Sequence, residues 1–240
     1  MKMFRKILIG AIVFCTAAAA FANTQKTELA ADGKSVVCGN KKMLLGKDGI
    51  ITIANAADKI AMISPYNAFI NKKTGATEWG FSSPSLCKMN VENGKVSWQF
   101  FKWRTDKSFK TGEQTLEIMP DGVIKLSTKF ENIDNDDVKF RNSGAYFITF
   151  PLSGSEGRKV VYNDSKTLTV SEKMSSQDWR SSEYKYDIFT DVPEKTFTVI
   201  ARKPEVKDTT LYRVNKDIRC TYIFPAGGSG VIYVDLKDKK

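Results

Sequence analysis

The chain has 240 residues, of which 42% are hydrophobic and 27% are charged. This composition is typical of a globular protein and excludes a disordered or collagen-like chain. The formal net charge is +10 and histidine is absent, which excludes an imidazole base, a His-ligated metal site and a Ser–His–Asp triad.

The first 22 residues have the pattern of a signal peptide. Lys2, Arg5 and Lys6 precede an apolar run at 7–14, and 20–22 (Ala-Phe-Ala) is a small-x-small cleavage site. The run is shorter than the roughly 20 residues of a spanning helix, which disfavours the alternative of an N-terminal membrane anchor. We therefore expect removal of 1–22 and a periplasmic or secreted mature chain without a transmembrane segment.

Export would place three cysteines, Cys38, Cys87 and Cys220, in an oxidising compartment. One disulfide could form in any of three pairings and leave one thiol over. Alternatively, all three side chains could be buried as small hydrophobic groups. The sequence leaves both alternatives open. The absence of a CxxC motif and of histidine argues against a zinc site.

The rest of the chain divides into three parts. Residues 23–34 are polar and without periodicity, which predicts a flexible arm, and 237–240 form a charged tail. Between them, 35–236 alternates strand-like segments with turn residues. The expected strands are 35–38, 42–45, 50–55, 59–64, 77–81, 95–103, 114–119, 123–130, 138–141, 145–150, 159–162, 168–171, 186–189, 197–202, 210–214, 220–224 and 231–236.

The clearest hairpin turns at Pro120-Asp121-Gly122. Its second arm, 124–130, alternates apolar and polar side chains, as expected of a half-buried antiparallel strand. Helical periodicity is not sustained in the mature chain, and no repeat or linker divides it. The sequence therefore predicts an all-β protein, an antiparallel β-sandwich forming one domain over 35–236.

Residues 124–151 read IKLSTKFENIDNDDVKFRNSGAYFITFP, a strand, an Asn- and Asp-rich turn and further strands. This segment resembles the corresponding part of galactose-mutarotase-like β-supersandwich domains, which occur in carbohydrate-active proteins. The resemblance implies a supersandwich and a role in sugar handling. It does not imply epimerase activity, because the epimerases of that family use catalytic histidines.

Two aromatic segments are candidate ligand sites. Residues 95–103 (KVSWQFFKW) place large rings on both faces of a strand, and Trp103 falls on the second face. Exposed aromatic rings stack on sugars and mark binding surfaces. The alternative is that these rings fill the core. The polar stretch 175–187 has the composition of a recognition loop. Its candidate ligand-binding residues are Asp178, Trp179, Arg180, Tyr184 and Tyr186.

No catalytic motif is present. A glycoside hydrolase would need a pair of carboxylates, and a polysaccharide lyase could use Tyr and Arg, but no spacing singles out such residues. The acidic turn at 132–137 lacks the ligand spacing of a calcium loop. We expect no metal or other cofactor, and export argues against nucleic acid.

The sequence favours an exported protein that binds a polysaccharide, oligosaccharide or other envelope ligand through surface aromatics. The alternatives are a structural protein that binds an envelope protein partner, or a carbohydrate-active hydrolase or lyase.

Overall fold

The computed structural model describes residues 25–56, 58–80, 87–104, 107–171, 177–179 and 183–238. The expected signal peptide at 1–22 lies outside the described residues. In the described parts the chain forms two antiparallel sheets and one 3₁₀ turn at Pro193–Lys195. The predicted all-β fold, a single antiparallel sandwich domain, is confirmed.

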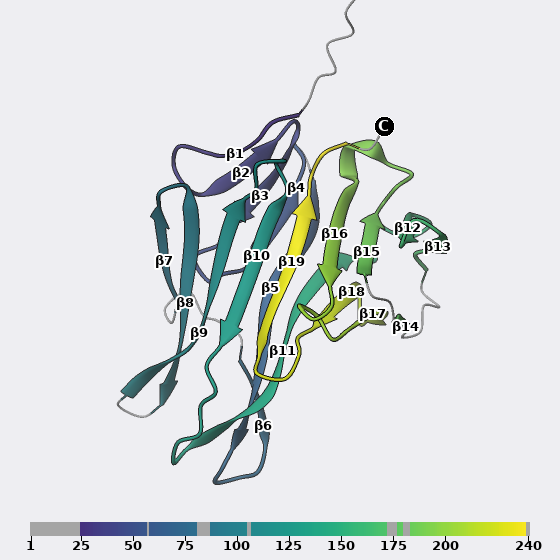
Figure 1. The fold of residues 1–240 in the computed structure, drawn as a ribbon. Coiled ribbons are helices and arrows are strands. Elements are labelled where there is room, and N and C mark those ends of the chain that lie inside the picture. Colours follow the sequence, from purple (N-terminus) through teal and green to yellow (C-terminus); the bar gives the residue numbers. More distant parts are fainter. Residues whose placement is uncertain are drawn as a thin grey trace, which may run out of the picture.

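Sheet A carries the described strands in the order β1 (Thr27–Leu29), β2 (Ser35–Cys38), β3 (Lys41–Leu45), β4 (Ile51–Ala54), β5 (Lys59–Asn71), β11 (Val138–Pro151), β18 (Asp217–Ile223), β17 (Asp208–Val214) and β14 (Gln177–Trp179), with β6 (Thr77–Gly80) beside β5. Sheet B carries them in the order β13 (Lys166–Thr169), β12 (Lys159–Tyr162), β15 (Glu183–Ile188), β16 (Phe197–Arg202), β19 (Ser229–Asp235), β10 (Ile124–Phe130), β9 (Lys107–Ile118), β8 (Lys95–Arg104) and β7 (Cys87–Glu92). Figure 1 shows sheet B in front, with β19 between β10 and β16, and β5 and β11 of sheet A behind it.

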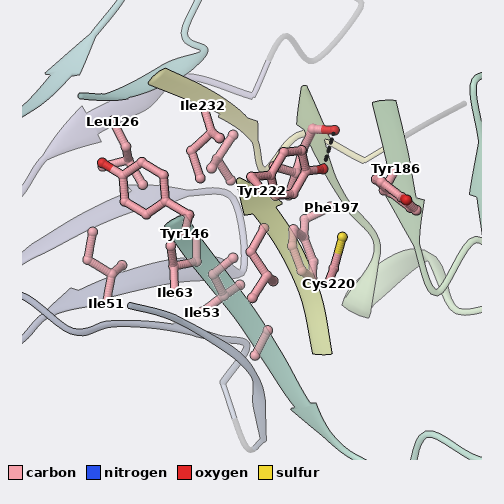
Figure 2. Close-up of a cluster of buried hydrophobic side chains, with 14 of the residues drawn as sticks. Ile51, Ile53, Ile63, Leu126, Tyr146, Tyr186, Phe197, Cys220, Tyr222 and Ile232 are labelled. Atoms are coloured by element: carbon pink, nitrogen blue, oxygen red, sulfur yellow. Dashed lines mark hydrogen bonds between the residues drawn. The ribbon is translucent and has the colours of Figure 1, made fainter. Parts of the chain in front are cut away.

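The core lies between the sheets because each strand turns alternate side chains inward. In β10 the buried positions are Ile124, Leu126, Thr128 and Phe130, as the alternation predicts. Leu126 and Ile232 of sheet B lie near Tyr146 and Ile63 of sheet A (Figure 2). Burial of such aliphatic and aromatic side chains is the main force that holds two sheets face to face.

Both ends of the described chain are tied to the sandwich. Thr27–Leu29 of the expected flexible arm forms β1, which pairs with β2. The prediction of a loose arm is therefore wrong at these residues. At the other end, Asp238 is held by Gln25: the Gln25 side-chain amide donates to Asp238 Oδ2, and Gln25 Oε1 accepts from the Asp238 backbone amide. The tail is thus anchored at Asp238 and not fully solvated.

The three described cysteines are free thiols. Cys38 and Cys220 are buried and Cys87 is partly buried, so none of the possible disulfides is formed. Burial raises the pKa of the Cys220 thiol far above its usual range. The structure agrees with the alternative in which these side chains pack as small hydrophobic groups, with Cys87 only partly covered.

Candidate functional site

The structure does not bring the candidate ligand-binding residues together on one surface. Trp103 lies in β8 of sheet B, whereas Asp178 and Trp179 lie in β14 of sheet A. Arg180 falls outside the described residues. Asp178 is in register with Thr210 of β17, so the predicted recognition segment is in part a short edge strand and not a loop.

Tyr184 and Tyr186 belong to the core. Both side chains have 0% exposure, and Figure 2 shows Tyr186 among the buried side chains. The hydroxyl of Tyr184 donates to the carbonyl of Lys207 at 3.2 Å, and that of Tyr186 bonds to Thr209 Oγ1 at 3.1 Å. The core thus buries both rings and provides a hydrogen-bond partner for each hydroxyl. The expectation that these two rings lie on the surface is therefore wrong.

A different tyrosine, Tyr233, is partly exposed on the outer face of sheet B. Its neighbours Ile232 and Val234 on β19 are fully buried, so the alternation of the strand directs Tyr233 outward. It is in register with Lys125 on β10 and Ile200 on β16. Tyr233 thus projects from the middle of the sheet, where flanking strands hold it on both sides.

Tyr233 lines a groove of about 490 Å³. This volume lies in the range of small-molecule sites. Apolar groups contribute most of the lining, and Arg202 and Asp121 add one charge of each sign. The lining residues are Met119, Pro120, Asp121, Val123, Ile200, Arg202 and Tyr233.

The ring of Tyr233 is oriented by two charged neighbours. Its hydroxyl donates to Glu205 Oε1 at 2.9 Å, and the guanidinium carbon of Arg202 lies 5.7 Å from the ring centroid. Partial burial and the bond to Glu205 raise the pKa of Tyr233 above its usual range. The hydroxyl therefore stays protonated at neutral pH and keeps donating to Glu205, which fixes the plane of the ring.

The β9–β10 turn forms one wall of the groove and is locked by local hydrogen bonds. Asp121 Oδ1 accepts from the Val123 amide at 3.0 Å, and the Gly122 amide donates to Met119 O at 2.8 Å. Gly122 has φ +83°, a conformation that glycine adopts without strain. The ammonium of Lys237 also donates to the carbonyl of Asp121. The wall is therefore pre-formed.

The groove can offer a flat ring, a cation and a carboxylate to one ligand. We did not expect Tyr233 to be a site residue from the sequence, although 231–236 was predicted to be a strand. The signal that could have identified it is the period-2 alternation of this strand, which directs the side chain of Tyr233 to the face opposite that of Ile232 and Val234.

The acidic turn at 132–137 uses its carboxylates in ion pairs. Lys72 Nζ lies 2.5 Å from Asp134 Oδ1, and Lys73 Nζ lies 3.3 Å from Asp137 Oδ1. Among the residues that the structure describes, no group of three or more Cys, Asp or Glu side chains is arranged to hold a metal ion. The same residues include no helix with the length and apolar composition needed to cross a bilayer.

No family model and no curated protein matches the sequence. A solved structure that aligns with the chain is that of a 4-alpha-glucanotransferase from Thermococcus litoralis, with a TM-score of 0.44 and 10% sequence identity. The alignment covers 90% of this chain and 41% of the glucanotransferase chain. The chain thus spans less than half of that enzyme's length, and membership of the galactose-mutarotase-like family stays a prediction.

Proposed function

We propose that this chain is an exported β-sandwich protein that binds carbohydrate in the groove beside Tyr233. One observation carries the proposal: a partly exposed aromatic ring lines a groove of about 490 Å³ together with Arg202 and Asp121. Aromatic rings pack on the apolar faces of sugar rings. The sugar hydroxyls would bond to the guanidinium and carboxylate groups at the rim.

The position of the ring supports binding in a defined pose. Tyr233 stands on a central strand, and its hydroxyl is already held by Glu205. A ring that is fixed before binding loses little side-chain entropy when a ligand stacks on it. The signal-peptide pattern of 1–22 supports the export part of the proposal, because an exported protein meets the polysaccharides of the envelope and the medium.

Calorimetric titration of the full chain with a panel of neutral and acidic oligosaccharides tests binding. We expect one class of sugar to bind the wild type and Tyr233→Phe, because the phenylalanine keeps the ring. Tyr233→Ala should bind at least ten-fold more weakly. Ser127→Ala, also on sheet B, is the control and should bind as the wild type does. Failure of the whole panel, or equal binding by Tyr233→Ala, would refute the proposal.

The export part has its own measurement. Expression of the full chain in a bacterial host, followed by intact mass of the soluble extracellular or periplasmic protein, should give a chain that begins at Asn23. A product that retains residues 1–22 in the cytoplasmic fraction would contradict export. The proposal of carbohydrate binding would then depend on the titration alone.

A further inference from the structure

The opposite outer face of the sandwich carries a second group of aromatic and basic side chains. Four neighbouring strands of sheet A, in the order β5, β11, β18 and β17, contribute to it. Directly opposed residues of antiparallel strands share a face. The opposed sets on this outer face are Tyr66–Ala145–Ile223, Ser64–Phe147–Thr221–Thr210 and Met62–Thr149–Arg219–Tyr212.

The centre of this face is a stack of two rings and a guanidinium group. The rings of Tyr66 and Phe147 have centroids 4.3 Å apart and planes inclined at 31°. The guanidinium carbon of Arg219 lies 4.5 Å from the centroid of Phe147. We call Tyr66, Phe147, Tyr212, Arg219 and Thr221 the sheet A cluster.

Two polar atoms of the sheet A cluster are buried without a hydrogen-bond partner. They are Nε of Arg219 and Oγ1 of Thr221, and the whole Thr221 residue is only 6% exposed. A buried donor that lacks an acceptor destabilises the fold by about as much as a lost hydrogen bond, so such groups are rare and call for an explanation. Neighbouring atoms shield both from solvent, so a ligand reaches them only when the Arg219 side chain shifts; acceptor oxygens brought to this face would then satisfy both atoms.

The charge of the face points to the kind of acceptor. Among the described residues, neither Arg219 nor the exposed Arg141 of β11 forms an ion pair. The guanidinium of Arg219 stacks on Phe147, which packs against Tyr66. Burial raises the pKa of Tyr66 to about 12, and the charges of Arg219 and Arg141 act against that rise. Asp217 precedes Arg219 by two residues on the same face, but no ion pair joins them. The cationic charge is therefore available to a ligand.

We propose that the sheet A cluster is a second binding site, which takes a sugar unit that carries a carboxylate or sulfate group. The anionic group would accept from the planar fork of Arg219, which is suited to two-oxygen acceptors. The sugar ring would lie against the aromatic rings, and Thr221 would bond to an oxygen of the same unit. The choice of a saccharide rests on the proposed function; the requirement for an anion rests on the sheet A cluster alone.

The place of the sheet A cluster agrees with this assignment. β14, which holds Asp178 and Trp179 of the predicted recognition segment, adjoins β17 at the edge of the same sheet. Thr210 is in register both with Asp178 and with Thr221. The segment that sequence composition marks for recognition is thus paired directly with β17, the strand that contributes Tyr212 to the sheet A cluster.

The test is calorimetric titration of the full chain with oligogalacturonate and heparin-derived oligosaccharides, with uncharged dextran oligomers as the comparison. We expect the acidic sugars to bind and their affinity to fall with added salt, because salt screens the charges. Arg219→Gln should weaken acidic binding at least ten-fold. Arg219→Lys should also weaken it, because lysine keeps the charge and lacks the planar fork.

Two further variants separate binding from folding. Arg141→Gln changes an exposed side chain and should weaken the binding of acidic oligosaccharides without altering the circular dichroism spectrum. This variant therefore tests the second site even if the Arg219 variants fail to fold. Arg213→Gln, an exposed arginine near the end of the neighbouring strand β17, is matched in charge and should bind as the wild type does. Unchanged binding by both Arg219→Gln and Arg141→Gln would overturn the assignment.

The outcomes also distinguish this inference from the function proposed at Tyr233. If neutral sugars bind in a Tyr233-dependent way and acidic sugars show no dependence on Arg219 or Arg141, only the second site is refuted. If acidic sugars bind through Arg219 and Tyr233→Ala changes nothing, the groove on sheet B is refuted and the second site stands. Equal binding of DNA or of phosphatidylglycerol vesicles would show a general polyanion surface and refute the saccharide assignment.

Discussion

The ammonium group of Lys41, which is almost completely buried, lies 2.6 Å from Oδ1 of Asp238. It also donates to the carbonyl of Leu236 at 2.8 Å. Lys41 opens β3 near the start of the described chain, and its partners lie next to the end. One buried cation therefore joins the two ends of the sandwich.

Loss of the Asp238 carboxylate should destabilise the protein in a pH-dependent way. Burial acts to raise the pKa of Asp238, but hydrogen bonds from Lys41 and Gln25 outweigh it and hold the pKa below its usual range. A carboxyl group whose pKa is lower in the folded state stabilises the protein at pH values above its unfolded-state pKa. This stabilisation is lost as the pH falls through the folded-state pKa. We expect Asp238→Asn to cost about 1–2 kcal/mol at pH 7, less than a fully buried pair because Asp238 is partly exposed.

Urea unfolding of wild type and Asp238→Asn from pH 7 to pH 2 provides the measurement. The two stability curves should converge in acid, since the wild-type carboxylate is protonated there. A constant difference over the whole range would contradict the assigned role of the charge. Lys26→Gln, on an exposed side chain at the same end, is the control and should unfold close to the wild type.

A buried hydrogen bond between the two sheets should show energetic coupling. Oγ1 of Thr128 lies 2.5 Å from the hydroxyl of Tyr146, and both residues are buried. Thr128→Val leaves the tyrosine hydroxyl without this partner, which should cost about 1–3 kcal/mol. The double variant with Tyr146→Phe should lose less than the sum of the two single variants.

Denaturant unfolding of the four proteins in this double-mutant cycle measures the coupling. Additive losses would show that the bond contributes no coupling energy. Ser127→Ala, which changes a neighbouring side chain on the outer face, should leave stability within about 0.5 kcal/mol of the wild type.

Gly144 of β11 should not tolerate a side chain. A Cβ atom at this position would lie 2.7 Å from Phe130 Cδ2 and 2.8 Å from Phe224 Cδ2. Both rings are buried and pack on each other with centroids 6.0 Å apart, so neither can move aside freely. We expect Gly144→Ala to destabilise by about 1–3 kcal/mol, the usual range for overpacking. A thermal melt that matches the wild type would show that the rings can rearrange.

The thiol of Cys87 should react slowly although it is partly exposed. Burial and then the nearby charge of Asp48 raise its pKa to about 12, so little thiolate exists at pH 8, and the thiolate is the reactive form. Alkylation with iodoacetamide followed by peptide mass analysis should label Cys87, Cys38 and Cys220 slowly in the native protein and rapidly in urea. A pair that resists labelling in urea without reductant would reveal a disulfide and contradict the free thiols of the structure.

Strands in which apolar and polar residues alternate could be predicted from the sequence. Strands without this alternation could not. The β9–β10 hairpin follows its period-2 pattern and its Pro-Asp-Gly turn. β7 was missed because it is an edge strand with mostly exposed side chains, so no apolar alternation marks it. β5 was expected to end before Pro65, yet it continues to Asn71 with Pro65 in register with Tyr146; proline lacks the amide donor, but the strands around it still pair.

The site was harder to predict for a physical reason. Tyrosine has an apolar ring and a polar hydroxyl. Whether it lies in the core or on the surface therefore depends on which neighbours form a hydrogen bond with the hydroxyl, and sequence composition does not show this. Tyr184 and Tyr186 lie in a polar stretch of sequence, but a backbone carbonyl and Thr209 satisfy them inside the core. The sheet A cluster draws its members from strands far apart in the sequence, a proximity that no local pattern reveals.

The position of β19 has a consequence for how the molecule is made. This strand is the last in the chain order, yet it pairs with β16 on one side and β10 on the other. During synthesis, β10 and β16 keep unpaired hydrogen-bonding edges until Ser229–Asp235 has been made. A chain truncated before Ser229 would therefore lose the strand that joins the two parts of sheet B, and the exposed edges of β10 and β16 would favour aggregation of such products.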